Sequence, residues 1–397
     1  MRILQIAPPW FPVPPISYGG IEWIVSSLAD GLTALGHDVT LVANGDSETS
    51  AELVSLFDGS SPERLGDPWM EAAHAVTAYL RAAEFDVVHD HTGIIGPAIA
   101  AAGGLRIPVV HTLHGPWTQR NEVLYRAISE RVALTAISHD QAARAPEGVR
   151  ISAVVHNGIE LDAYTVGRDR DAFLLFVGRA SHEKGPEVAI EVARRVGMPI
   201  VLAMKVNEPD EHRYLEQVVR PAMVGVEVEL RTSVGHAEKA ELMRRARAVV
   251  VPIAWDEPFG LVMAEAAASG APVVAFRRGS APELVLDGIS GRLVAPGDVD
   301  AMAEAVDGIG TIDPLDCRAW AEGRFSARRM VRRYLRVYDE LTVRRPSPVA
   351  TSSNGARADA VRTDGMRADG IRNGAIAAPA RGTTSRLIRI TGDPDAA

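Results

Sequence analysis

The chain reads Gly167-Arg168-Asp169-Arg170-Asp171 and, after Ala172, Phe173-Leu174-Leu175-Phe176-Val177, and this stretch decides how it is divided. The first five residues are a polar connector, and the apolar run after them has the length and composition of a buried parallel strand. Similar runs alternate with helical patterns on both sides of the connector, which is typical of parallel sheets covered by helices on both faces. The sequence therefore predicts an α/β protein with two doubly wound domains, residues 1–166 and 167–326.

The same alternation places the remaining elements. The expected strands are residues 1–7, 39–43, 86–89, 109–113, 134–137 and 152–155 in the first domain and 173–177, 200–204, 226–230, 249–253, 273–276 and 291–294 in the second. A final helix, residues 327–343, is expected to return to the first domain. Its apolar stripe is flanked by arginines, which we interpret as a solvated face, with peripheral contact to anionic lipid as the alternative.

Length, composition and charge exclude several classes of protein. The 397 residues suffice for two compact domains, and residues 346–397 hold few large apolar side chains, which predicts a disordered tail. Because 42 basic residues face 51 acidic ones, a dedicated nucleic-acid binder is disfavoured. Cys317 stands alone, so a disulfide framework or a cysteine-rich zinc site is excluded. We expect a cytoplasmic protein, with peripheral contact at the inner membrane face as the alternative.

Paired glycines, Gly19-Gly20, follow the first expected strand at the start of a helix. Glycines at this place let a ligand approach the backbone N–H groups of a helix N-terminus, which is a site suited to anions. The alternative, that they only turn the chain, stays open. No G-x-G-x-x-G motif follows this strand, which disfavours a nicotinamide-dependent dehydrogenase.

Histidines end two neighbouring strands of the first domain: His89 and His91 on one, His111 and His114 on the next. Alternate residues of a strand face opposite sides of the sheet, and the spacing is not that of a zinc site, so we expect no metal there. A histidine beside a cleft at the carboxyl end of a strand is better interpreted as a hydrogen-bond partner of ligand hydroxyls.

The first strand of the second domain runs into Gly178-Arg179-Ala180-Ser181-His182-Glu183-Lys184-Gly185, before a helix near Pro186. Arginine offers a fixed fork for phosphate oxygens, and lysine offers a mobile positive charge. Beside a helix N-terminus, Arg179 and Lys184 could hold a diphosphate and stabilise it as a leaving group without a metal ion. Ordinary surface ion pairs are the alternative.

A later stretch carries two glutamates, Asp256-Glu257-Pro258-Phe259-Gly260-Leu261-Val262-Met263-Ala264-Glu265-Ala266. Glu265 lies in a helix of small residues that can pack closely on a sheet, so its carboxylate needs a polar partner. A ribose diol or sugar hydroxyls would supply that partner. The backbone N–H groups of residues 259–261 can add donors at the helix start.

Together these segments resemble the retaining, sugar-nucleotide-dependent glycosyltransferases of family 4, which have the two-domain GT-B fold. The matching residues are Gly19-Gly20, Thr112-Leu113-His114-Gly115, Asn157-Gly158-Ile159, Gly178-Arg179 with Lys184-Gly185, and Glu257-Pro258-Phe259-Gly260 through Glu265-Ala266 to Gly270-Ala271-Pro272-Val273. They occur in the order of the family, from residue 1 to about residue 343, and leave only the tail uncovered.

The resemblance implies a role for each charged residue. Arg179 and Lys184 would bind the donor diphosphate, Glu265 would bind the ribose, and Glu257 would bind hydroxyls of the transferred sugar. His114 would face that sugar near the reacting carbon. The first domain would bind the acceptor and the second the nucleotide sugar, across a central cleft.

The resemblance also implies positions for uncharged residues of the donor and acceptor sites. Gly19 and Gly20 would lie at the junction of donor and acceptor, and Phe259, Gly260 and Leu261 would contact the donor. Many relatives have a glycine-rich turn where this chain has Lys205 and Asn207. The resemblance therefore does not define the shape of the pocket for the nucleotide base. Lys205 is a further candidate for contact with a phosphate or the acceptor.

The implied reaction is the transfer of a hexose from a nucleoside diphosphate to a hydroxyl group with retention of configuration. The leaving phosphate would help to deprotonate the acceptor, a glycan, lipid or small molecule, and neither a metal nor another cofactor is expected. Two alternatives remain: a nucleotide-sugar-binding scaffold without catalysis, and a nucleotide-sugar epimerase of the same fold.

Overall fold

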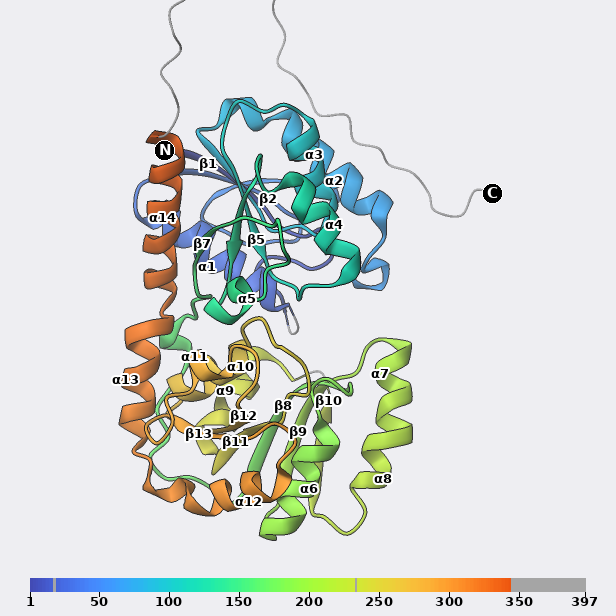
Figure 1. Cartoon of the computed structure of the whole chain (residues 1–397), viewed down its shortest axis with the longest axis vertical. Helices are drawn as coiled ribbons and strands as arrows, with labels where there is room; N and C mark the ends of the chain where they lie inside the picture. The colour runs from blue at the N-terminus through green and yellow to red at the C-terminus, as the bar shows by residue number, and fades with distance from the viewer. Residues whose placement is uncertain (17–18, 233, 344–397) are drawn as a thin grey trace, which may run out of the picture. The chain divides into compact units, whose positions relative to one another are not determined.

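A computed structural model describes residues 1–16, 19–232 and 234–343 of the chain (Figure 1). The disordered tail predicted for residues 346–397 lies outside these ranges. Within them, the chain forms two parallel sheets, one in each half of the sequence. The predicted α/β class with two doubly wound domains is confirmed.

The first sheet has seven strands. From edge to edge they are β3 (Glu52–Val54), β2 (Asp38–Val42), β1 (Arg2–Ile6), β4 (Val87–Asp90), β5 (Val109–Leu113), β6 (Ala133–Ala136) and β7 (Ile151–Val154). All neighbouring strands run parallel. The short edge strand β3 was not predicted, because its three half-exposed residues form no apolar run.

The second sheet has six parallel strands. From edge to edge they are β10 (Val228–Thr232), β9 (Ile200–Lys205), β8 (Leu174–Arg179), β11 (Ala248–Val251), β12 (Val273–Phe276) and β13 (Gly291–Val294). The predicted strand over 226–230 begins two residues later in the structure. This edge strand is only half-buried, so its apolar pattern is weak.

Helices connect the strands in both halves. The first domain contains α1 (Gly20–Ala34), α2 (Pro68–Leu80), α3 (Ile95–Ala102), α4 (Gln119–Ile128) and α5 (His139–Ala143). The second contains α6 (Pro186–Val196), α7 (Pro209–Tyr214), α8 (Arg220–Ala222), α9 (His236–Arg245), α10 (Leu261–Ala268), α11 (Ala281–Leu284), α12 (Val299–Asp307) and α13 (Pro314–Phe325), and the last described helix is α14 (Ala327–Val343). None of these helices combines the length and the apolar composition needed to cross a bilayer.

The final helix, α14, packs against the first sheet beside α1, while α13 packs on α10 in the second domain (Figure 1). The apolar face of α14 buries Met330, Val331, Tyr334 and Tyr338 in the core on that side of the sheet. The chain crosses between the domains in the turn between α13 and α14, before this helix begins.

Two crossings of the chain between the domains lie side by side. The backbone N–H of Ile159 donates to the carbonyl of Phe325 at 2.7 Å, and that of Ala327 donates to the carbonyl of Ile159 at 2.9 Å. A Cβ on Gly158 would lie 2.6 Å from the Cα of Ala327, so only glycine fits where the crossings touch. Residues far apart in sequence are therefore fixed together between the sheets.

Candidate active site

The strand order reverses at equivalent points of the two sheets, between β1 and β4 in the first and between β8 and β11 in the second. Ligands of open α/β sheets bind beyond the carboxyl ends of the strands at such a point. Gly19 follows β1, Arg179 ends β8, and Glu257 follows β11. The topology thus places the predicted segments at the switch points of the two sheets, and residues from both points line common clefts.

Two adjoining clefts occupy this place. The first, which we call the basic cleft, is lined by Gly19, Gly20, Trp23, Val177, Gly178, Arg179, Lys184, Ala203, Met204, Lys205, Asn207, Val234, Lys239, Glu257, Gly260, Leu261, Val262 and Glu265. The second, which we call the histidine cleft, includes Glu22, His91, Thr92, His111, His114, Asn121, Tyr125, Asn157 and Phe259 and shares Gly19, Gly20, Glu257, Gly260 and Leu261 with the first. Apart from His89, all the site residues predicted from the sequence line one of these clefts, and His91, His111, His114 and Phe259 line only the second.

The backbone at the start of α1 requires glycine at position 19, and Gly20 lies close to the other domain. Gly19 has a φ of 146°, and a Cβ there would lie 2.7 Å from both Glu22 Oε2 and Pro15 Cβ. A Cβ on Gly20 would lie 3.3 Å from Leu261 Cδ1, at the start of α10 in the other domain. The glycines therefore allow close packing between the two domains, in addition to turning the chain.

Arg179 and Lys184 lie on either side of the turn between β8 and α6. Arg179 is the last residue of β8, and its Nη2 is 2.9 Å from Glu183 Oε1. Lys184 forms an ion pair with Glu257, and its Nζ lies 5.3 Å from the centroid of the Trp255 ring. Both cations are half-buried, so each can contact a ligand in the basic cleft.

A left-handed glycine fixes the turn between these residues and α6. Gly185 has a φ of 70° and forms the N-cap, and a Cβ on it would lie 2.7 Å from the carbonyl oxygen of Pro252. Pro186 then occupies the first helical turn, where a missing N–H leaves no intrahelical hydrogen bond unmade. The positive end of the α6 dipole therefore lies directly beside Lys184.

Glu257 is held in the loop before α10. Its Oε2 accepts a hydrogen bond of 2.8 Å from Trp255 Nε1 and pairs with Lys184. Gly260 forms the N-cap of α10 with a φ of 82°, and a Cβ there would lie 2.5 Å from Met263 Cε. Both observations explain why glycine stands at this position. The carboxylate is thus positioned where the two clefts meet.

Glu265 lies on α10 with only 6% of its surface exposed. Its Oε1 is 2.7 Å from Lys239 Nζ on α9, and the hydroxyl of Tyr164 also hydrogen-bonds to its carboxylate. Burial, with a further contribution from the charge of Glu265, raises the pKa of Tyr164, so this hydroxyl stays protonated and donates. The partner expected for Glu265 from the sequence was a ligand, whereas the structure supplies two protein groups.

Lys205, at the end of β9, is buried and already paired. Its Nζ lies 2.6 Å from Glu208 Oε1 and 3.3 Å from Glu211 Oε1. Two carboxylates therefore balance its charge at the edge of the basic cleft. Contact with a phosphate would have to occur in addition to these pairs.

His114 is the end of a hydrogen-bonded chain that reaches α14. Its Nε2 lies 2.9 Å from His91 Nδ1, and His91 Nε2 lies 3.0 Å from Gln5 Oε1. Gln5 Nε2 in turn donates to the hydroxyl of Tyr338 at 3.1 Å. Burial, assisted by His111, lowers the pKa of His114 to about 3, so the ring is neutral at pH 7. It can exchange hydrogen bonds with a sugar hydroxyl without adding charge.

The other histidines differ in their access to the clefts. His89 does not line either cleft, and its two ring nitrogens lie 2.6 Å from Tyr338 Oη and 2.7 Å from Thr112 Oγ1. Burial lowers the pKa of His111 to about 4, and its Nε2 lies 3.3 Å from the hydroxyl of Tyr125. His91, His111 and His114 line the histidine cleft, but both ring nitrogens of His91 are already paired, so the predicted contact with ligand hydroxyls is left to His111 and His114, and His89 supports the fold instead.

Glu22, on the first turn of α1, was not among the residues predicted from the sequence. It lines the histidine cleft with 3% of its surface exposed, and burial raises its pKa to about 7, against a smaller effect of a backbone hydrogen bond. In the sequence it reads as an ordinary acidic residue of a helix N-terminus. Only the packing of Gly19 against its carboxyl group reveals that it is enclosed.

Replacing Glu22 by glutamine should make protein stability less dependent on pH. Its folded-state pKa of about 7 exceeds the ordinary 4.5, so stability is lost as pH rises through this interval. The glutamine variant should match the wild type near pH 4 and exceed its free energy of unfolding by about 3 kcal/mol at pH 8. Urea unfolding at both pH values checks this, and an equal difference at both would contradict it.

Lys239 and Trp255 were also missed. Lys239 lies on a helix rich in charged residues and reads as solvated, and only the packing of α9 beside α10 brings it to Glu265. Trp255 lies two residues before Glu257, so its sequence position could have drawn attention to it. Its ring lies beneath Lys184 and its N–H holds Glu257, which links the two candidate groups.

The two halves of the chain match two related families. Residues 18–163 match the family described as Glycosyltransferase Family 4, and residues 162–321 match Glycosyl transferases group 1. Together these matches span more than half of the chain. They meet within a few residues of the boundary proposed from the sequence, 166/167.

Similar proteins agree with these matches. The chain is 28% identical over 382 residues to a glycogen synthase of Mycobacterium tuberculosis, covering 83% of this chain and 89% of the relative. It is 28% identical over 390 residues to a D-inositol 3-phosphate glycosyltransferase of Xylanimonas cellulosilytica, covering 83% and 93%. The solved structure of HepE from Anabaena in complex with UDP and glucose has the same fold, with a TM-score of 0.70, 20% identity and coverage of 86% of this chain and 100% of that one. This chain therefore belongs to the glycosyltransferases of the GT-B fold, with a family 4 domain followed by a group 1 domain.

Proposed function

We propose that the protein transfers a hexose from a nucleoside diphosphate to an acceptor hydroxyl, with retention of configuration and without a metal ion. The observation that carries this proposal is the basic cleft, where Arg179 and Lys184 lie beside the N-terminus of α6 and two glutamates line the same wall. Cations and a helix dipole suit a diphosphate, and carboxylates suit sugar and ribose hydroxyls.

The donor would lie along the basic cleft. The diphosphate contacts Arg179 and Lys184, and the ribose lies near Glu265, whose carboxylate Lys239 and Tyr164 orient. Negative charge grows on the diphosphate as the glycosidic bond breaks, so cations held in place stabilise the transition state more than the ground state. UDP and glucose, which HepE binds, make UDP-glucose the first donor to test.

The transferred sugar would lie at the meeting point of the clefts, between Glu257 and His114. The acceptor would occupy the histidine cleft, where Asn157 Oδ1 is buried and has no hydrogen-bond partner among the described residues, and where Thr92 Oγ1 and His111 Nδ1 have only Asp90 beside them. Unpaired buried polar atoms are costly, and ligand hydroxyls would satisfy them. This supports a polyhydroxylated acceptor or a sugar-bearing one.

The carboxyl groups that line the clefts bear on how a retaining transfer would deprotonate the acceptor. Among the described lining residues these groups are Glu22, Glu257 and Glu265. Glu257 and Glu265 are each paired with a lysine, and Glu22 is largely protonated below pH 7 because burial raises its pKa to about 7. None is well placed to be a nucleophile, so we assign deprotonation of the acceptor to an oxygen of the leaving phosphate on the same face of the sugar.

A panel of nucleotide sugars tests the proposal. Each donor is incubated with and without a set of sugar, polyol and lipid acceptors, nucleotide release is measured, and the anomeric configuration of the product is read by NMR. Release that depends on the acceptor supports transfer. Conversion of the donor to an isomer would support an epimerase, and tight binding without turnover would support a scaffold.

Activity should survive removal of divalent metal ions, because side-chain cations and a helix end hold the diphosphate in this proposal. Excess EDTA should leave the initial rate within about twofold of the untreated rate, an effect of less than about 0.5 kcal/mol on the barrier. The measurement is nucleotide release in matched buffers. An enzyme silenced by EDTA and restored by Mn²⁺ would contradict metal independence.

We further place the protein in the cytoplasm, consistent with a free, buried Cys317. Peripheral contact with a membrane could be made by the solvent-facing arginines of α14. Flotation with vesicles of anionic and neutral lipid would test this contact.

A further inference from the structure

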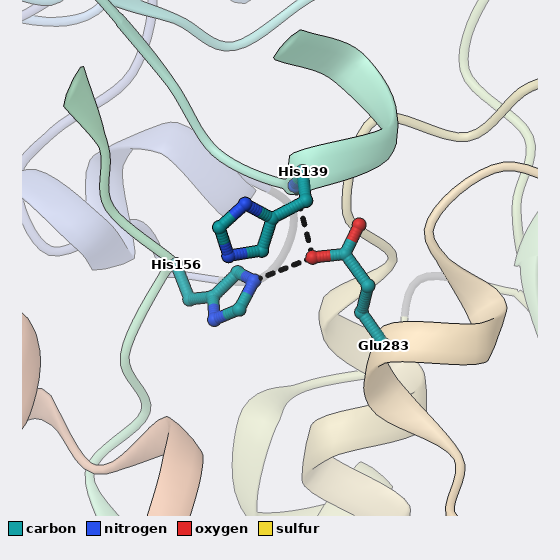
Figure 2. A group of neighbouring side chains, drawn as sticks. All are labelled: His139, His156 and Glu283. Carbon is teal, nitrogen blue, oxygen red and sulfur yellow. Dashed lines mark hydrogen bonds and ion pairs between the residues drawn. The ribbon is translucent and has the colours of Figure 1, made fainter. Parts of the chain in front are cut away.

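Two histidines and a glutamate meet where the domains touch, outside both clefts (Figure 2). His139 is the first residue of α5 and His156 follows β7, both in the first domain, whereas Glu283 comes from α11 in the second. His156 Nε2 lies 2.7 Å from Glu283 Oε2. Nothing in the proposed transfer reaction uses this group of residues.

These three side chains have the chemistry of a zinc site. One ligand atom from each residue can be chosen such that all lie within 4.8 Å of one another. Imidazole nitrogens and a carboxylate oxygen bind Zn²⁺ at about 2.0–2.2 Å, so the ligands of a tetrahedral ion are about 3.3 Å apart. Small side-chain movements would therefore bring these three to one ion.

We propose that His139, His156 and Glu283 form a binding site for a divalent transition-metal ion of the zinc class, bridging the two domains. Three protein ligands would leave a fourth position for water, as in zinc sites that keep an open position. The exposed side chain of His139 makes that position accessible to solvent.

The carboxylate is already oriented by backbone groups. The N–H of His139 donates to Glu283 Oε2 at 2.9 Å, and the N–H of Asp140 donates to Oε1 at 2.7 Å. Such outer hydrogen bonds hold a ligand in place and strengthen metal binding.

His156 is equally constrained. Its buried ring lies 5.9 Å from the rings of both Phe259 and Phe325 and 5.5 Å from that of His139, centroid to centroid. On metal binding, His156 Nε2 would exchange its hydrogen bond with Glu283 for coordination of the ion. The ion takes the position of that hydrogen bond, and the His139 side chain turns to complete the site.

Titration of metal-free protein with ZnCl₂ in a calorimeter tests the site. We expect one ion per chain and a concentration-dependent rise in thermal transition temperature, because the ion binds only the folded arrangement. His139→Ala removes an exposed ligand and should weaken binding at least ~100-fold. His182→Ala, at an exposed histidine elsewhere in the second domain, is the matched control and should bind as the wild type does.

A second variant distinguishes the loss of a metal ligand from the loss of the folded structure. Glu283→Gln retains one accepting oxygen but loses the anionic ligand and one of the two acceptors, so it should remain folded, with a modestly lower transition temperature in EDTA, and bind Zn²⁺ weakly. Co²⁺ should give visible absorption bands of a tetrahedral site in the wild type and not in either ligand variant. Absence of stoichiometric binding, or equal affinity in wild type and His139→Ala, would show that the cluster is only a hydrogen-bonded contact between domains.

Discussion

Replacing Arg179 by alanine is expected to reduce turnover about 100- to 1000-fold in a protein that remains folded, equivalent to roughly 3–4 kcal/mol of transition-state stabilisation. Arg179 is the last residue of β8, and its half-buried side chain forms an ion pair with Glu183 alone among the described residues. Its loss should therefore disturb little of the structure. The measurement is the steady-state rate with saturating donor. Arg179→Lys keeps the charge without the fork and should lie between wild type and alanine.

Lys184→Ala should be similarly severe, but for two reasons. It removes a cation from the diphosphate and leaves the half-buried Glu257 without its ion-pair partner. Arg245→Ala, which breaks an exposed ion pair with Asp171, is the control for loss of a basic residue and should retain the wild-type rate. Full activity in Arg179→Ala or Lys184→Ala would overturn their assignment to the diphosphate.

Glu257→Gln is expected to lower kcat about 100-fold and to leave the affinity for the bare nucleoside diphosphate unchanged. Its carboxylate lies where the clefts meet, and a carboxylate there is favoured more strongly as the sugar ring gains positive charge in the transition state. Steady-state kinetics and calorimetry with the nucleotide measure the two quantities. Trp255 Nε1 can still donate to the amide oxygen, so the loop should keep its position.

Glu265→Gln should have the opposite signature and raise the donor KM about tenfold with little change in kcat. The ribose does not change during the reaction, so binding to it is nearly uniform between ground and transition states. Because this change also weakens the pair with Lys239, the thermal transition of the variant must be measured alongside. If Glu257→Gln weakens nucleotide binding and Glu265→Gln spares it, the two roles are reversed.

The sequence predicted the two sheets and most of the cleft because both depend on local signals. Apolar runs mark buried strands, and the strand order places the turns after them at one edge. Arg179 and Glu257 could be found because they stand in such turns. The partners of these residues could not, since Lys239 reaches Glu265 only through packing of α9 beside α10, and enclosure raises the pKa of Glu22 only after Gly19 packs on it.

The proposed metal ligands between the domains could not be predicted from the sequence either. His139, His156 and Glu283 are separated by up to 144 residues and follow no ligand spacing in the sequence. They meet only because α11 of one domain lies against the start of α5 in the other. Contacts between domains are the least predictable part of such a chain, because no periodic pattern records them.

The return of α14 to the first sheet determines the order in which the protein can mature on the ribosome. The side of that sheet covered by α1 remains incomplete until Met330, Tyr334 and Tyr338 have been synthesised, although its strands emerge long before. The second domain has its own core and can fold while the first waits with an exposed apolar face. Nascent chains halted before residue 327 should therefore be prone to capture by chaperones, even though every strand of both sheets is already present.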